Sequence, residues 1–376
     1  MADVPISGRQ VTRIAAEIGR ELEADRDQQT QRFHDRKLDP TVITRPALAV
    51  VEVDGGRLRI RSGEGDGPGA HGATWREDKI ALLTTAALKP FETDPEPELP
   101  TCFRDPAYVE KLAREIGGVG SLGLVGSPTE SPEAGPTSSR SATSRAPELL
   151  VRTYVATTRD SEAFGPMVAA EAQRRHFHAA ASGAFVGDGA AWLWKLHREF
   201  FPHFTAVVDF LHVLSYVYAS ARAVATEPAA RWARYLEWAE ACWQGRVAHV
   251  IKELRGFQES LGRLSAEAFE ELAEDDPRKV LARSVVYLEH NADRMDYPRY
   301  RREGLPTTSS HAESTVKLFN RRVKGTEKSW GEAGAEAILQ LRAAYLSEDG
   351  RLDRHHRSRP RSPYRNYKTR RTRKAA

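Results

Sequence analysis

The chain has 376 residues and a formal net charge of +4 at pH 7, with 40% hydrophobic and 29% charged residues. This is the composition of a folded protein with room for two or three domains, and no apolar stretch approaches the roughly 20 residues of a membrane helix. The N-terminus shows no secretory signal, and the two cysteines, Cys102 and Cys242, exclude a disulfide framework and indicate a reducing compartment.

The first predicted element is a helix, or a pair of helices, over residues 6–36. Ser7 and Gln10 have the spacing of a capping box, and apolar residues follow at helical intervals until Gly19, which could interrupt the helix. The segment starting at Ser7 is similar to the second helix of a helix-turn-helix, although an ordinary amphipathic helix explains the same pattern. We therefore expect residues 1–40 to be an N-terminal helical segment, with a partial helix-turn-helix as the alternative interpretation.

The next elements predict a sheet. Alternating apolar residues over residues 47–61 indicate a β-hairpin that turns at Gly55-Gly56, and residues 75–89 favour a third strand. Residues 117–147 are rich in Gly, Ser, Pro and Thr and predict a flexible loop. Further strands and helices are expected in alternation, with strands at 152–157, 185–188 and 205–209 and helices at 161–178 and 190–200.

Helical spacing continues from Phe210 to about Glu289, and a final helix is expected from Ser310 to about Ser347. The order of elements predicts an α/β fold, with a mixed sheet, flanking helices and an all-helical insertion. The expected divisions are a core over residues 45–212, a helical insertion over 213–300 and a return to the core over 301–347.

The last segment is strongly basic. Residues 351–374 contain 11 Lys or Arg and one Asp, a net +10, so the rest of the chain is near −6. Cations of this density suit phosphate backbones because each neutralised phosphate releases counterions, although a disordered solubilising tail has the same composition. We expect residues 348–376 to be a basic disordered tail.

Three acidic residues predict a metal site. Asp188 ends an apolar run at Gly187-Asp188-Gly189, and Asp54 ends another before Gly55-Gly56. With Glu313 as a third carboxylate, such a set could hold two Mg²⁺ ions for displacement at phosphorus. Each residue also has an ordinary interpretation, since Asp-Gly is a common turn and a lone glutamate is usually a solvated helix residue.

Two further patterns flank these acids. Asp209 and His212 have helical spacing and could form a hydrogen bond, either within the active site or as a structural pair. Ser310 and Glu313 form a second possible capping box. Beyond them we expect a basic ridge that contacts DNA, unless this is a simple surface helix; the ridge comprises Lys317, Arg321, Arg322 and Lys324.

Together these motifs resemble the bacterial insertion-sequence transposases of the ISKra type, relatives of the Mutator-like DDE enzymes. The resemblance covers residues 6–347. It depends on the following motifs: Val51-Glu52-Val53-Asp54-Gly55-Gly56, Gly187-Asp188-Gly189-Ala190-Ala191-Trp192-Leu193-Trp194, Phe201-Pro202, Val208-Asp209-Phe210-Leu211-His212, Ser310-His311-Ala312-Glu313-Ser314, Lys317, Arg321-Arg322-Val323-Lys324-Gly325-Thr326 and Trp330.

The resemblance implies an RNase H-like fold whose helical insertion precedes the last acid. It implies that Asp54, Asp188 and Glu313 bind two Mg²⁺ or Mn²⁺ ions, with Asp209 and His212 as an accessory motif. The implied activity is cleavage at the inverted-repeat ends of an element and strand transfer into target DNA, by a homodimer or larger assembly in the bacterial cytoplasm or nucleoid. A nuclease or resolvase on the same sheet, and a decayed or domesticated DNA-binding protein without activity, are the alternatives.

Overall fold

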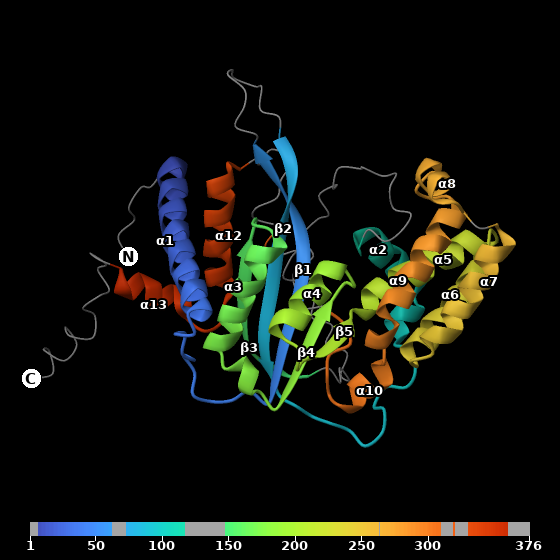
Figure 1. Cartoon of the computed structure of the whole chain (residues 1–376), viewed down its shortest axis with the longest axis horizontal. Coiled ribbons are helices and arrows are strands. Elements are labelled where there is room, and N and C mark those ends of the chain that lie inside the picture. Colours follow the sequence, from blue (N-terminus) through green and yellow to red (C-terminus); the bar gives the residue numbers. More distant parts are fainter. Residues whose placement is uncertain are drawn as a thin grey trace, which may run out of the picture.

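The computed structural model describes residues 7–61, 73–116, 147–262, 264–309, 319 and 330–359. The predicted loop at residues 117–147 and the tail beyond residue 359 lie almost wholly outside the described residues. The described chain forms five strands and twelve α-helices (Figure 1). The strands are β1 (Leu48–Arg61), β2 (Ala73–Ala86), β3 (Leu149–Thr157), β4 (Ser182–Gly187) and β5 (Thr205–Val208). The helices are α1 (Gly8–His34), α2 (Pro106–Ile116), α3 (Ser161–Arg174), α4 (Ala191–Phe200), α5 (Phe210–Val224), α6 (Pro228–Trp243), α7 (Val247–Ser260), α8 (Ala266–Glu271), α9 (Pro277–Asn291), α10 (Tyr297–Arg302), α12 (Glu332–Leu346) and α13 (Arg351–Ser358).

The strands form one mixed sheet in the order β3-β2-β1-β4-β5. β2 is antiparallel to both of its neighbours, whereas β4 runs parallel to β1 and to β5. The parallel connections pass through helices, as parallel pairing requires. The predicted α/β class with a mixed sheet is therefore confirmed.

The predicted hairpin over residues 47–61 is wrong. β1 continues without a turn through Gly55-Gly56, and the antiparallel partner of the whole strand is β2. At Gly56 a Cβ atom would lie 2.7 Å from a carboxylate oxygen of Asp78 on β2, so this glycine permits a close approach across the ladder. The third strand predicted near residues 75–89 is confirmed as β2.

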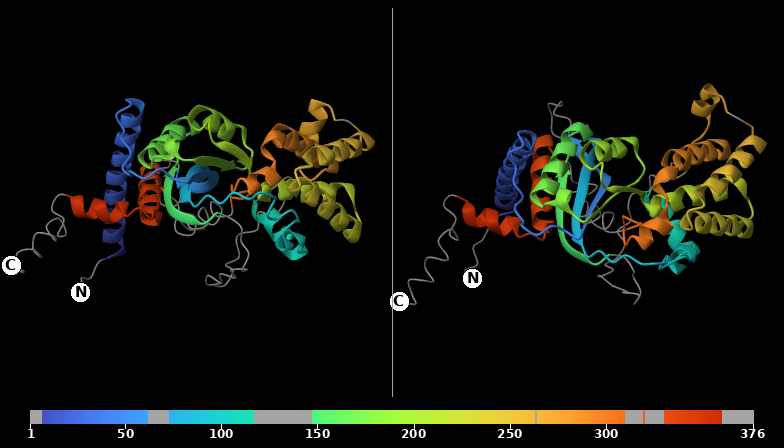
Figure 2. Two further views of the ribbon diagram at one scale, coloured as in Figure 1. Left: turned by 90° about the horizontal axis from the view of Figure 1, so that it is seen from below. Right: turned by 60° about the horizontal axis from the view of Figure 1, so that its bottom comes forward.

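Both faces of the sheet are covered. On one face, α12 packs over Leu58, Ile80 and Tyr154, and α1 lies against α12 and α3. On the other face, side chains of α3 and α4 join the main core with Val51 and Phe185. Figures 1 and 2 show the sheet between α1 and α12 at one end and the helical block α5–α9 at the other.

The predicted N-terminal helix is confirmed as α1, and so is its capping box. The hydroxyl of Ser7 accepts from the backbone N–H of Gln10, whose side chain accepts from the backbone N–H of Ser7. Gly19 does not interrupt the helix. It lies where α1 and α12 touch, because a Cβ atom there would come within 2.2 Å of the carbonyl oxygen of Ala337.

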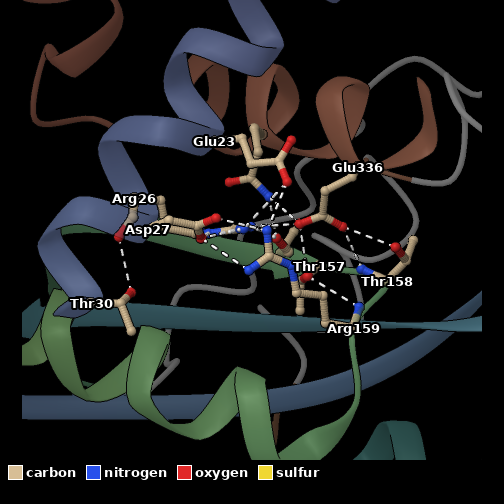
Figure 3. Close-up of polar contacts among 10 residues, drawn as sticks. Glu23, Arg26, Asp27, Thr30, Thr157, Thr158, Arg159 and Glu336 are labelled. Carbon is tan, nitrogen blue, oxygen red and sulfur yellow. Dashed lines mark hydrogen bonds and ion pairs between the residues drawn. The ribbon is translucent and has the colours of Figure 1, made fainter. Parts of the chain in front are cut away.

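A polar cluster connects the C-terminal half of α1 to β3 and α12 (Figure 3). Glu336 of α12 accepts from Arg26 at 2.6 Å, from the Thr157 hydroxyl at 2.8 Å and from the Thr158 N–H at 2.8 Å. Burial opposes ionisation of Glu336, but these donors lower its pKa below the ordinary value. Because Arg26, Thr157 and Thr158 all donate to one buried carboxylate of α12, the cluster links three elements far apart in sequence.

The first part of the basic C-terminal segment is a helix and not a disordered tail. Residues 351–358, expected to be disordered, form α13. Arg351 donates to Glu171 of α3 at 2.5 Å, and Arg359 donates to Glu21 of α1 at 2.7 Å. In the described part of the chain, no helix has the length and apolar character needed to cross a membrane.

The contact at Gly19 gives a stability prediction. Gly19→Ala should lower the free energy of unfolding by about 1–3 kcal/mol, because the added methyl group must push α1 away from the backbone of α12. The matched control is Gly256→Ala in α7, where a Cβ atom meets nothing within 4 Å and the free energy should rise by about 0.5–1 kcal/mol. Urea denaturation measures both, and equal effects of the two substitutions would contradict the tight α1–α12 contact.

Candidate active site

The pairing of β1 with β4 brings two predicted acids together. In the parallel register Glu52 lies beside Val186 and Val53 beside Gly187, so the next residues along the two strands are Asp54 and Asp188. Side chains on paired strands alternate together, which places both aspartates on the same face of the sheet. Asp188 directly follows β4, whereas Asp54 lies within β1 at the point where pairing with β4 ends.

The turn after Asp188 is held by the backbone and by α9. The carboxylate of Asp188 accepts from the N–H of Ala190 at 2.8 Å, and its carbonyl accepts from the hydroxyl of Tyr287 at 2.8 Å. Gly189 has a φ of +100°, and a Cβ atom there would lie 2.6 Å from the Tyr287 ring. Glycine is therefore required by the backbone angle and by the closeness of the ring.

Asp209 and His212 join the same edge from β5. The N–H of Asp209 donates to the carbonyl of Gly187 at 2.8 Å, which fixes the end of β5 beside the end of β4. Asp209 is the N-cap of α5, and His212 Nδ1 lies 3.0 Å from its Oδ2. The predicted hydrogen bond between these two residues is confirmed.

The carboxylate of Asp209 has no capacity left for another ligand. Its Oδ1 accepts from the N–H groups of Leu211 and Ser309, at 3.0 and 3.1 Å, and its Oδ2 contacts His212 and the Ser309 hydroxyl, the latter at 2.5 Å. A carboxylate offers about four acceptor positions, and all four are in use. Asp209 therefore organises the site, and Ser309 is a partner that the sequence patterns did not reveal.

Charges within this group shift one another's pKa values. Burial raises the pKa of Asp54 to about 6, with smaller increases from the charges of Asp188 and Asp209, while His212 and the Gly55 N–H oppose the shift. Burial alone would lower the pKa of His212, but the hydrogen bond and charge of Asp209, with the charges of Asp188 and Asp54, raise it to about 9. His212 is therefore a cation at neutral pH that partly offsets the acidic charges.

Glu52 is a buried acid that the motif search missed. Burial raises its pKa to about 8, and the charge of Asp209 adds to the shift, so Glu52 is largely protonated at neutral pH. The signal was present in the sequence, because alternation along Val51-Glu52-Val53-Asp54 puts Glu52 on the same face as Asp54.

Asp54 and Asp188 differ from Asp209 in having free ligand capacity. Each accepts one backbone N–H, from Gly55 at 2.7 Å and from Ala190 at 2.8 Å. Within the described residues, the other oxygen of each carboxylate accepts no hydrogen bond. Two half-buried carboxylates with unused oxygens are the donors that Mg²⁺ or Mn²⁺ prefers, with water completing the coordination.

The described part of the chain contains one compact group of three potential metal ligands, and it lies elsewhere. Ligand atoms of Glu237, His249 and Glu253 all lie within 4.8 Å of one another. Arg234 pairs with Glu237 at 2.8 Å and with Glu253 at 3.4 Å, so a cation already offsets part of the negative charge of this group. Asp54, Asp188 and Asp209 do not form such a compact group among the described residues.

A cavity of about 590 Å³ opens beside the Asp188 turn. Gly189 forms part of its wall, and α5 and α9 contribute the ring pair of Tyr216 and Tyr287, which stack with centroids 3.8 Å apart. Arg283 and His290 add polar groups. The helical block therefore borders the candidate site directly.

The remaining predicted site residues lie outside the described residues. These are Glu313, the third expected carboxylate, and the expected basic ridge of Lys317, Arg321, Arg322 and Lys324. Of this segment the structure describes Phe319, which is buried with Tyr154 in the core beneath α12.

The raised pKa of Asp54 predicts a pH-dependent gain in stability. The folded-state pKa of about 6 exceeds the ordinary value of 3.8, so the cost of the buried charge develops between about pH 4 and 6 and persists above. In the presence of a chelator, Asp54→Asn should raise the free energy of unfolding by roughly 1–3 kcal/mol at pH 8 and by little at pH 4. Urea denaturation at both pH values measures this, with the exposed Asp293→Asn as control. The same gain at both pH values would contradict the assignment.

No protein-family model matches the sequence, and no curated protein matches it either. The resemblance to ISKra-type transposases therefore depends on the sequence motifs themselves.

Proposed function

We propose that this chain is a DNA transposase that cuts at the ends of a mobile element and joins the 3′-hydroxyl to target DNA. The observation that carries the proposal is the pair Asp54 and Asp188. These carboxylates occupy equivalent positions on neighbouring parallel strands, share one face, and each keep an oxygen without a hydrogen bond among the described residues. Carboxylates arranged in this way suit divalent cations and phosphate chemistry.

In this proposal Asp54 and Asp188, with Glu313 as a third ligand, would hold two Mg²⁺ or Mn²⁺ ions. When bound, such ions would neutralise the phosphate and stabilise the charge that develops in an in-line displacement. The chain's own contribution is positioning. Asp209 ties the ends of β4 and β5 together, Tyr287 holds the Asp188 turn, and the His212 cation lessens repulsion between the acids before metal binds.

Chain connectivity supports the place of Glu313 in this set. Ser309 is bonded to Asp209 through both its N–H and its hydroxyl, and Glu313 is four residues later. Four extended residues span at most about 14 Å, a length that keeps Glu313 in the neighbourhood of the two aspartates. Its ligand role stays a proposal, as does DNA contact by Lys317, Arg321, Arg322 and Lys324.

The proposed core is RNase H-like, with the helical block as an insertion before Glu313. Two features support this proposal. The mixed sheet carries helices on both faces, and the helical block α5–α9 follows β5 directly. A homodimer or larger assembly on paired DNA ends completes the proposal, since joining two ends requires two sites.

The proposal predicts which substitutions abolish the reaction. Asp188→Asn, Asp54→Asn and Glu313→Gln should each reduce Mg²⁺-dependent cleavage at least about a hundredfold, because each removes a charge that the metal ions need. Glu237→Gln, which alters an exposed acid of α6 outside the proposed site, should leave the rate of cleavage unchanged. The substrate is a labelled plasmid that carries the coding sequence with its native flanking DNA.

The products decide between the related functions. Excised ends joined to target DNA support a transposase, whereas cleavage without joined products supports a nuclease or resolvase. Tight DNA binding with no metal-dependent cleavage supports a decayed or domesticated DNA-binding protein. Full activity in Asp188→Asn would overturn the metal site itself.

A further inference from the structure

The strands β1 and β2 extend beyond the rest of the sheet as a two-stranded ribbon. Pairing of β1 with β4 ends at Val53, and pairing of β2 with β3 begins at Lys79. From Asp54 to Arg61, the strand partner of β1 is β2, and near its end β1 also forms a short parallel bridge, in which Trp330 donates to the carbonyl of Arg59 and accepts from the N–H of Arg61. Figure 1 shows this ribbon projecting past the end of β4, and its tip, residues 62–72, lies outside the described residues.

The two faces of the ribbon differ in chemistry. On one face Leu58 and Ile60 are buried in the core beneath α12, and Arg76 pairs with Glu332 of that helix. On the opposite face β1 presents an arginine at every second residue, namely Arg57, Arg59 and Arg61; the first and last are exposed and Arg59 is half-buried. Alternation along the strand produces this division.

An aromatic side chain interrupts the arginine face. Trp75 of β2 lies directly opposite Arg59 in the register and is 62% exposed. Glu77, opposite Arg57, is the one acid on this face within the described part of the ribbon, and it pairs with Lys79 at 3.2 Å. The face therefore combines a net positive charge with an exposed ring, although the chain outside its basic C-terminal segment is acidic.

We propose that this face, defined by Arg57, Arg59, Arg61 and Trp75 and called the arginine ribbon, binds DNA next to the reaction centre. Alternate residues on a strand are about 7 Å apart, so successive arginines can meet successive phosphates of one strand. An exposed indole can stack on a base or sugar without regard to sequence. This inference rests on the proposed function in one respect, which is that DNA is the polyanion to be bound.

The ribbon is distinct from the catalytic pair. Asp54 belongs to the even-numbered face with Leu58, whereas the arginines belong to the odd-numbered face. Arg57 is only three residues, or about 10 Å, along β1 from Asp54. The ribbon therefore holds DNA that flanks the reacting phosphate and not that phosphate itself, so its loss should raise KM for DNA and leave kcat unchanged.

The test measures binding of the full chain to labelled duplex and single-stranded DNA by fluorescence anisotropy, in chelator and at several salt concentrations. The double variant Arg57→Gln/Arg61→Gln should weaken binding and reduce the slope of log K against log salt by about two, because each phosphate contact contributes about 0.9. Trp75→Ala should weaken single-strand binding about tenfold with the slope unchanged. Urea denaturation of each variant checks that it is folded under the conditions of the binding measurement.

The matched control is Arg76→Gln, which removes one charge from the same ribbon but from the face that packs on α12. It should leave the salt slope unchanged. An unaltered slope in the double variant, or an equal change in Arg76→Gln, would overturn the proposal. Polyglutamate displacing DNA at equal charge, with the same dependence on Arg57 and Arg61, would also overturn it in favour of an acidic protein partner.

The result is separable from the catalytic proposal. Binding in chelator does not require the metal site, so the arginine ribbon can be confirmed in Asp188→Asn even when cleavage is lost or was never present. Conversely, normal cleavage with a normal KM in the double variant would reject the ribbon and leave the catalytic assignment intact.

Discussion

The parallel pairing of β1 with β4 is the constraint on which the candidate site depends. The register that sets Val53 beside Gly187 also sets Asp54 beside Asp188, and a shift by one residue would turn one of the two acids to the opposite face. Buried apolar residues on both strands hold this register, because a slip would take Val51 or Phe185 out of the main hydrophobic core in which both are packed. The hydrophobic core therefore fixes the geometry of the acidic pair.

The helical block α5–α9 also contributes contacts to the candidate site. Asp209 caps α5, donates its N–H to the end of β4 and accepts a hydrogen bond from the hydroxyl of Ser309. Tyr287 of α9 donates to the carbonyl of Asp188. These contacts join β4, β5, α5 and α9 at one edge. The charge arrangement has a cost, since Glu52 is buried, Asp54 is half-buried, and burial raises the pKa values of both. Acids with shifted pKa values are typical of functional sites.

At the other end of the molecule, contacts among α1, α12 and β3 stabilise the sheet. The carboxylate of Glu336 gathers donors from α1 and β3, and the contact at Gly19 brings α1 against α12. α12 in turn covers Leu58 and Ile60, the apolar face of the β1–β2 ribbon. An isolated two-stranded ribbon is marginally stable in water, so this helix layer allows the opposite face to carry arginines.

The sequence by itself determined the local features that depend on near neighbours. The capping box of Ser7 and Gln10, the α/β class and the hydrogen bond between Asp209 and His212 all follow from short-range spacing. The glycine pair after Asp54 is ambiguous in the sequence, because glycine permits a turn and a close approach equally well, and the close approach of Asp78 on β2 decides between them. Only tertiary structure showed that Asp209 is saturated by Ser309 and that Glu52 is buried. The reason is that burial and ligand capacity are set by residues about 100 positions or more away in the chain, and no local pattern records them.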